Sequence, residues 1–123
     1  MIATRGTGAA GGRGGMDVVM GWYPLRRVRV RGPSMAPTLG DGDTVVAVRK
    51  NPRPGDVVLV TWDDRPGQLS VKRAVRPDGG GWHVEGDNPR GSTDSRGLGP
   101  ARVHAVVLWR LAPAPRRLGR SRP

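Results

Sequence analysis

The sequence of 123 residues contains no cysteine, so a disulfide scaffold, a zinc-thiolate site and a cysteine nucleophile are all excluded. Only two histidines are present, His83 and His104, which leaves no histidine cluster for a metal and disfavours a Ser-His-Asp triad. Phenylalanine is also absent, and the aromatic residues are four Trp and one Tyr. A core must therefore come mainly from Val, Leu and Ala, and we expect no metal and no cofactor.

A long hydrophobic run is missing as well. The longest apolar stretch near the N-terminus, 18–25, is interrupted by Gly21 and Pro24 and falls far short of the roughly 20 residues of a transmembrane helix. Asp17 precedes this stretch and arginines follow it, without the small-residue cleavage site of a signal peptide. We therefore expect a cytoplasmic protein without a transmembrane anchor, for which peripheral membrane contact stays open. Met16 and Met20 are alternative starts of the chain.

Acidic residues are few, and the formal net charge is +11, a value that first suggests nucleic acid. Only +4 of this charge lies in residues 28–111, because arginines concentrate near both ends of the chain. The basic charge therefore indicates solubility and loose anionic contacts, and we expect no specific nucleic-acid partner.

Composition divides the chain into three parts. Residues 1–23 form a Gly/Arg-rich segment predicted to be flexible, 24–111 form the folded domain, and 112–123 form a basic Pro/Arg-rich tail. Within the domain, short Val-rich runs bounded by Gly, Pro, Asn or Asp predict strands at 25–31, 44–48, 57–62, 69–75, 82–85 and 103–111. No ten-residue stretch has a helical period. We therefore predict an all-β fold, a coiled sheet or partly closed β-barrel of about six strands.

Ser34 lies between Pro33 and Pro37, directly after the first predicted strand. The two prolines favour a rigid turn that exposes the serine hydroxyl. An ordinary turn serine has the same pattern, so this segment alone leaves both interpretations open.

Lys72 is one of only two lysines, beside 19 arginines, and the other is Lys50. Strand alternation places Lys72 on one face with the small residues Ser70 and Ala74, where an ammonium group can be partly buried. Burial can remove the proton of a lysine but not of an arginine, so a lysine here favours a role that needs a neutral amine. A surface lysine on a solvated strand is the alternative.

The loop 86–97 contains two acids, two arginines and two serines. Such a set of short polar side chains can build a hydrogen-bonded network that braces a site, or can form a solvated connection between strands.

In their order and spacing, these segments resemble the signal peptidase I family of Ser/Lys proteases. Four boxes carry the resemblance: 34–39, 42–48 with 55–58, 72–75, and 86–88 with 92–96. The resemblance covers residues 28–111 and implies the small all-β fold of that family. The short chain without an anchor is most similar to the branch of nickel-type superoxide dismutase maturation proteases.

The resemblance implies a site. Ser34 would be the nucleophile, Lys72 its neutral general base, and the Ser34 backbone N–H a donor to the oxyanion. The residues that the resemblance places in support of this dyad are Ser92, which aims the lysine amine, and Asp94, Arg96, Arg73 and Asp87. Some family members carry a second oxyanion donor two residues before the nucleophile, where this sequence has Gly32. That donor is therefore unassigned.

The resemblance also implies a protein substrate, the proform of a nickel superoxide dismutase, whose N-terminal leader would be removed. Nickel would bind this substrate and not the present chain. Three alternatives stay open. A general signal peptidase I lacking its anchor would share every site residue, and a self-cleaving repressor of the SOS type would share the Ser/Lys chemistry, although 1–27 are too short and Gly-rich for a helix-turn-helix. A non-catalytic β-barrel binding module would retain its function without Ser34 and Lys72.

Overall fold

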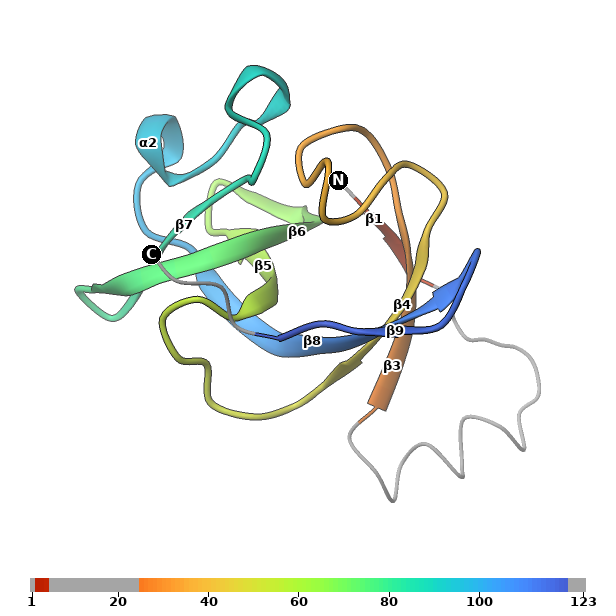
Figure 1. Ribbon diagram of the computed structural model, residues 1–123. Helices are drawn as coiled ribbons and strands as arrows, with labels where there is room; N and C mark the ends of the chain where they lie inside the picture. Colours follow the sequence, from red (N-terminus) through yellow and green to blue (C-terminus); the bar gives the residue numbers. More distant parts are fainter. Residues whose placement is uncertain (1, 5–24, 120–123) are drawn as a thin grey trace.

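The computed structural model describes residues 2–4 and 25–119, and antiparallel β-strands make up most of it (Figure 1). The strands are β1 (Ile2–Thr4), β3 (Leu25–Val30), β4 (Thr44–Val48), β5 (Val57–Trp62), β6 (Arg65–Asp78), β7 (Gly81–Glu85), β8 (Arg102–Ala112) and β9 (Arg116–Arg117). The helical parts of the described chain are single turns, the 3-10 turn η1 (Pro89–Gly91) and the helix α2 (Ser95–Leu98). The predicted all-β class is therefore confirmed.

The six predicted strands all form. Three of them, β6, β7 and β8, are longer than predicted, and β3 ends one residue earlier than predicted. Strand β6 extends over Arg65–Asp78 instead of 69–75, and it contains Pro66 and Pro77, which the sequence pattern places between strands. Both prolines are exposed and lie near the ends of β6, where a missing backbone N–H disturbs few ladder hydrogen bonds.

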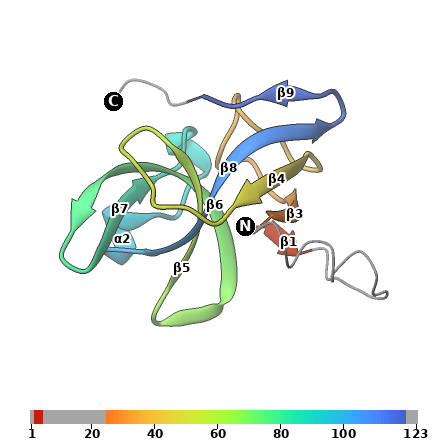
Figure 2. The ribbon, with the colours of Figure 1, turned by 90° about the horizontal axis from the view of Figure 1, so that it is seen from below.

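The strands form one sheet in the order β1-β3-β4-β8-β5-β6-β7 (Figure 2). Strand β9 pairs with Trp109 and Arg110, in the part of β8 that extends beyond its pairing with β5. All pairs are antiparallel, and the sheet coils without closing into a barrel. The coil brings β1 into contact with β6, although these strands are far apart in the sheet order. The turn that follows β3 consequently lies near β6.

Two buried clusters form the core, one on each face of β5. Val57 and Leu59 belong to the first cluster, whereas Val58 and Val60 belong to the second. Burial on both faces explains why β5 is a continuous apolar run without polar alternation. As expected, Val, Leu and Ala dominate both clusters, joined by Met35 in the first and Trp62 in the second.

Strand pairing also occurs outside the predicted domain limits, 24 and 111. Strand β1 pairs with β3, and β9 pairs with β8. Leu118 is only 8% exposed and packs into the first core cluster. Most of the predicted flexible segment 1–23 and residues 120–123 lie outside the described residues, so the three-part division stays a prediction. Within the described chain, none of the helices has the length and hydrophobicity required to span a bilayer.

Candidate active site

Three segments that are distant in sequence meet at one cavity of about 290 Å³. Ser34 reaches it from the turn after β3, Lys72 from β6, and Gly91 and Thr93 from the loop after β7. The structure therefore brings together the two residues predicted to form the dyad, 38 positions apart in the chain.

The turn that carries Ser34 is anchored on both sides. Below it, Met35 and Leu39 are fully buried in the first core cluster. Beside it, the backbone N–H of Asn88 donates to the Ser34 carbonyl at 2.9 Å, and the Asn88 side-chain amide donates to the Pro33 carbonyl at 3.0 Å. Ser34 is only 7% exposed, more enclosed than the sequence predicts, yet it lines the cavity. Its backbone N–H has no acceptor within the described part of the chain.

Lys72 is 2% exposed, because the face of β6 that carries it is covered by the second core cluster. Its backbone is in register with Val58, and Ala74 lies two residues further on the same face. The predicted alternation is thus confirmed. Burial lowers the pKa of Lys72, the Asp94 carboxylate raises it, Arg96 lowers it, and the net direction is downward. A larger fraction of Lys72 is therefore in the neutral amine form than for a solvated lysine at the same pH.

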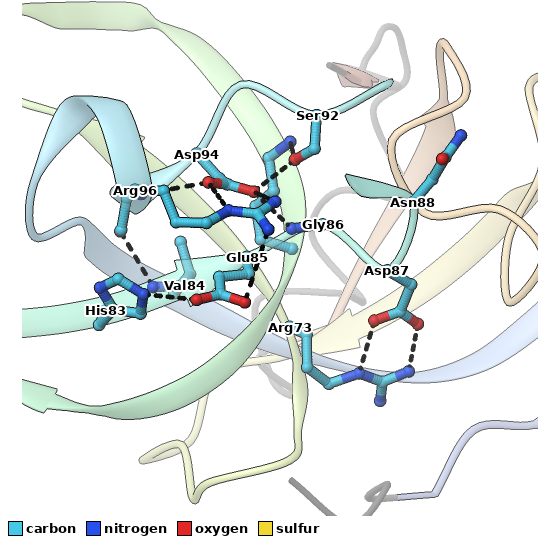
Figure 3. A network of polar contacts seen from close by, with 12 residues as sticks. Arg73, His83, Val84, Glu85, Gly86, Asp87, Asn88, Ser92, Asp94 and Arg96 are labelled. Carbon is cyan, nitrogen blue, oxygen red and sulfur yellow. Dashed lines mark hydrogen bonds and ion pairs between the residues drawn. The ribbon is translucent and has the colours of Figure 1, made fainter. Parts of the chain in front are cut away.

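Ser92 connects Lys72 to Asp94. The Lys72 Nζ donates to Ser92 Oγ at 3.1 Å, and the Ser92 hydroxyl donates to Asp94 Oδ2 at 2.7 Å (Figure 3). Because its single proton points to Asp94, the Ser92 oxygen presents a lone pair to the amine. Ser92 therefore forms a hydrogen-bonded link between the Lys72 amine and the Asp94 carboxylate.

Asp94 is a buried carboxylate, 3% exposed, with hydrogen bonds on both oxygens. Arg96 donates to it through Nη2 at 2.6 Å and Nε at 3.0 Å, and the Gly86 backbone N–H donates at 2.9 Å. Burial by itself raises the pKa of Asp94, but the hydrogen bonds from Arg96, Ser92 and Gly86 outweigh it and hold the pKa well below its usual range. Asp94 is therefore ionised at neutral pH, and it accepts the hydrogen bond from the Ser92 hydroxyl.

Arg73 and Asp87 form a second ion pair, away from the first (Figure 3). Their contacts are bidentate, at 3.1 Å from Nε to Oδ1 and 2.6 Å from Nη2 to Oδ2. Thr38 donates to the same carboxylate at 2.5 Å, and Arg73 also donates to the Gly55 carbonyl at 2.9 Å. Asp87 thus ties the turn of Ser34 to β6.

The sequence analysis missed Gly86 as a site residue. A Cβ at this position would collide with Ser92 Oγ and with the Ser34 carbonyl oxygen, so only glycine lets the chain at position 86 approach both Ser92 and the turn of Ser34 this closely. Its position between β7 and Asp87 was the available signal. Gly32 does not supply a second oxyanion donor, since its N–H donates to Asp41 at 2.8 Å.

The polar network also extends further than predicted. The Glu85 carboxylate forms a 2.7 Å hydrogen bond with His83 Nε2 and lies 4.0 Å from the Arg96 guanidinium (Figure 3). Alternation on β7 places His83 and Glu85 on one face. That spacing was the only sequence signal for them.

Comparison with known families places this fold and site in a class. The family model described as Peptidase S24-like matches residues 23–101, more than half of the chain, including every residue of the predicted site. The chain therefore belongs to the peptidase S24-like family. It is a serine protease of the S24 type. This match establishes the family but not the signal peptidase I branch, and the SOS-repressor alternative fits the same family. No curated protein matches the chain.

Proposed function

We propose that this S24-type serine protease is an endopeptidase with a Ser34/Lys72 dyad, and that it removes an N-terminal leader from a protein precursor. The observation that carries the proposal is the Lys72 amine, which is 2% exposed, lies on the same cavity as Ser34 and is held by Ser92. A permanently charged lysine is costly in such a place, whereas a neutral amine there is a general base.

In the proposed reaction, Ser34 Oγ attacks the carbonyl carbon of the scissile bond while its proton passes to the neutral Lys72 amine. The carbonyl oxygen becomes an oxyanion, to which the Ser34 backbone N–H donates. When the C–N bond breaks, the Lys72 ammonium returns its proton to the leaving amine and an acyl-enzyme forms. Water then attacks the ester and gives a proton to Lys72, which passes it to Ser34 Oγ as the acid product leaves.

Ser92 and Asp94 support this cycle without touching the substrate. The amine must direct its lone pair toward Ser34 while one N–H points to Ser92, and the Asp94 carboxylate fixes the Ser92 hydroxyl in the accepting orientation. Asp94 also attracts the ammonium form that arises after attack, because its charge favours protonated Lys72.

For the substrate, we propose the proform of a nickel superoxide dismutase. The support is the likeness of the boxes in 28–111 to that branch of signal peptidase I proteases. A general signal peptidase would use the same site residues on Ala-x-Ala leaders. Self-cleavage of the SOS type is the second candidate, because the S24-like match favours it.

The test pairs each enzyme variant with the dismutase precursor in one cell and measures the intact masses of both proteins. The variants are Ser34→Ala, Lys72→Ala, Lys72→Arg and, as a matched control, Lys50→Arg at the exposed second lysine. We expect the wild type and Lys50→Arg to remove the leader, Ser34→Ala to be inactive because it has no nucleophile, and the two Lys72 variants to lose about 10²–10⁴-fold in rate. Arginine keeps the charge but cannot supply a neutral amine.

The other outcomes separate the candidates. Loss of mass from the enzyme itself, in the wild type and Lys50→Arg but not in the dyad variants, would assign self-cleavage. Cleavage of an Ala-x-Ala peptide but not of the precursor would assign the general signal peptidase. Near wild-type activity of Lys72→Arg would remove Lys72 from the mechanism.

A further inference from the structure

The cavity beside Ser34 is lined by positive charge. Arg31 and Arg65 line it, and the described residues that line it include no Asp or Glu. A substrate segment that enters this cavity therefore meets two guanidinium groups, which stay charged at every working pH.

The guanidinium of Arg65 is not neutralised by the fold. Its side chain is exposed and makes no ion pair or hydrogen bond within residues 2–4 and 25–119. Among the nearby acids, Asp63 pairs with Arg102 at 3.3 Å and Asp94 pairs with Arg96. Asp64 precedes Arg65 in the chain but does not line the cavity.

The other residues that line the cavity form an apolar wall and add neutral polar groups. Trp62, 3% exposed, is fixed by its indole N–H, which donates to the Gly99 carbonyl at 2.9 Å. Leu98 adds to this apolar side, and Gln68 and Ser70 add neutral polar groups. The cavity thus has room for a side chain with an aliphatic stem and a carboxylate end, which an arginine fork can bind.

We infer that this protease selects substrates with an acidic side chain close to the scissile bond, and that Arg65 is a specificity-determining residue. The inference rests on the proposed endopeptidase function of the same site, because it assumes that the substrate segment occupies the cavity next to Ser34. It adds to that function a substrate class, a peptide with Asp or Glu at a fixed position beside the cleaved bond.

The test uses fluorogenic peptides that carry Ala on both sides of the scissile bond and one Glu at each flanking position in turn, each matched by the Gln peptide. We expect kcat/KM for Glu to exceed that for Gln at one position by roughly two- to fivefold, as for a solvent-accessible charge pair. Arg65→Gln should remove the preference. Arg76→Gln should retain it, since Arg76 is an exposed arginine of the same strand outside the cavity. Raising the salt concentration should weaken it.

A second measurement separates this inference from the proposed catalysis. Ser34→Ala cannot cleave, so anisotropy of labelled peptides on this variant reports binding alone. Tighter binding of the Glu peptide, lost in the Ser34→Ala/Arg65→Gln double variant, would support the acidic subsite even if the wild type cleaved neither peptide. Equal binding and equal cleavage of Glu and Gln peptides at every position would overturn the inference, and so would a preference that survives Arg65→Gln.

Discussion

Asp94→Asn tests how strongly the buried network holds the site. The wild-type carboxylate accepts from two sides: Oδ2 takes the Gly86 N–H and the Ser92 hydroxyl, and Oδ1 takes the Arg96 backbone N–H at the start of α2. An asparagine has one oxygen and one NH2 group. In either orientation the NH2 group faces donors, so one side of the network loses its acceptor.

The magnitude follows from these contacts. Loss of the negative charge converts two charge-assisted hydrogen bonds, from Gly86 and Ser92, into neutral ones, at about 1 kcal/mol each. Since one oxygen cannot serve both sides, a helix cap or an equivalent bond is lost, which costs about 1 kcal/mol more. The half-exposed guanidinium of Arg96 can turn to water and is not counted. We therefore expect the free energy of unfolding to fall by about 3 kcal/mol.

Urea unfolding at neutral pH, followed by Trp fluorescence, measures this loss, and Asp64→Asn is the matched control at an exposed carboxylate. The pKa of Asp94 is depressed by folding, so its contribution is present above the ordinary carboxyl pKa of about 3.9 and is lost as the pH falls below it. The difference in the free energy of unfolding between the wild type and Asp94→Asn should therefore become smaller at acidic pH. If Asp94→Asn were as stable as Asp64→Asn at neutral pH, or if its loss of stability did not depend on pH, the Asp94 carboxylate would not stabilise the fold through its charge.

Two further predictions concern the dyad itself. Because burial lowers the pKa of Lys72 from 10.5, kcat/KM for peptide cleavage should rise with pH through a midpoint below 10.5. Asp94→Asn should move that midpoint lower, since it removes the negative charge that raises the pKa of Lys72. A midpoint at or above 10.5 in the wild type would contradict the burial of the amine. Gly86→Ala should reduce kcat/KM about 100-fold or more, because its methyl group displaces Ser92 and the Ser34 turn. Gly97→Ala, where a methyl group meets open space, is the control, and equal activity of the two variants would show that Gly86 is not required for this close approach.

Much of the sheet could be predicted from the sequence, because strand boundaries and alternation depend on local residue types. Gly, Pro, Asn and Asp bound the runs that become β4 and β5, and the boundaries of both strands match the prediction. The alternation along β6 correctly placed Lys72 and Ala74 on one face and Val71 on the other. These features depend on a residue and its immediate neighbours, because pleating alone sets which side chains share a face.

For the candidate site, the sequence indicated the separate segments but not all of the contacts between them. Ser34, Lys72 and the loop 86–97 could be identified as unusual segments, and their joint order and spacing suggested a protease of the Ser/Lys type. Neither segment by itself indicated that Gly86 would approach both Ser34 and Ser92, since that contact depends on how the loop 86–97 folds and on how it packs against the turn of Ser34.

The all-β class, the positions of six strands and the side of β6 on which Lys72 lies could be predicted from local sequence patterns. Other features depend on how distant segments pack: β8 pairs between β4 and β5, the sheet coils until the turn after β3 reaches β6, and Leu118 joins the core. The tertiary structure also decided that Lys72 is desolvated while Arg65 keeps an uncompensated charge at the same cavity. Strand propensity and alternation act over a few residues, whereas pairing order, burial and electrostatic compensation arise only when distant segments pack together.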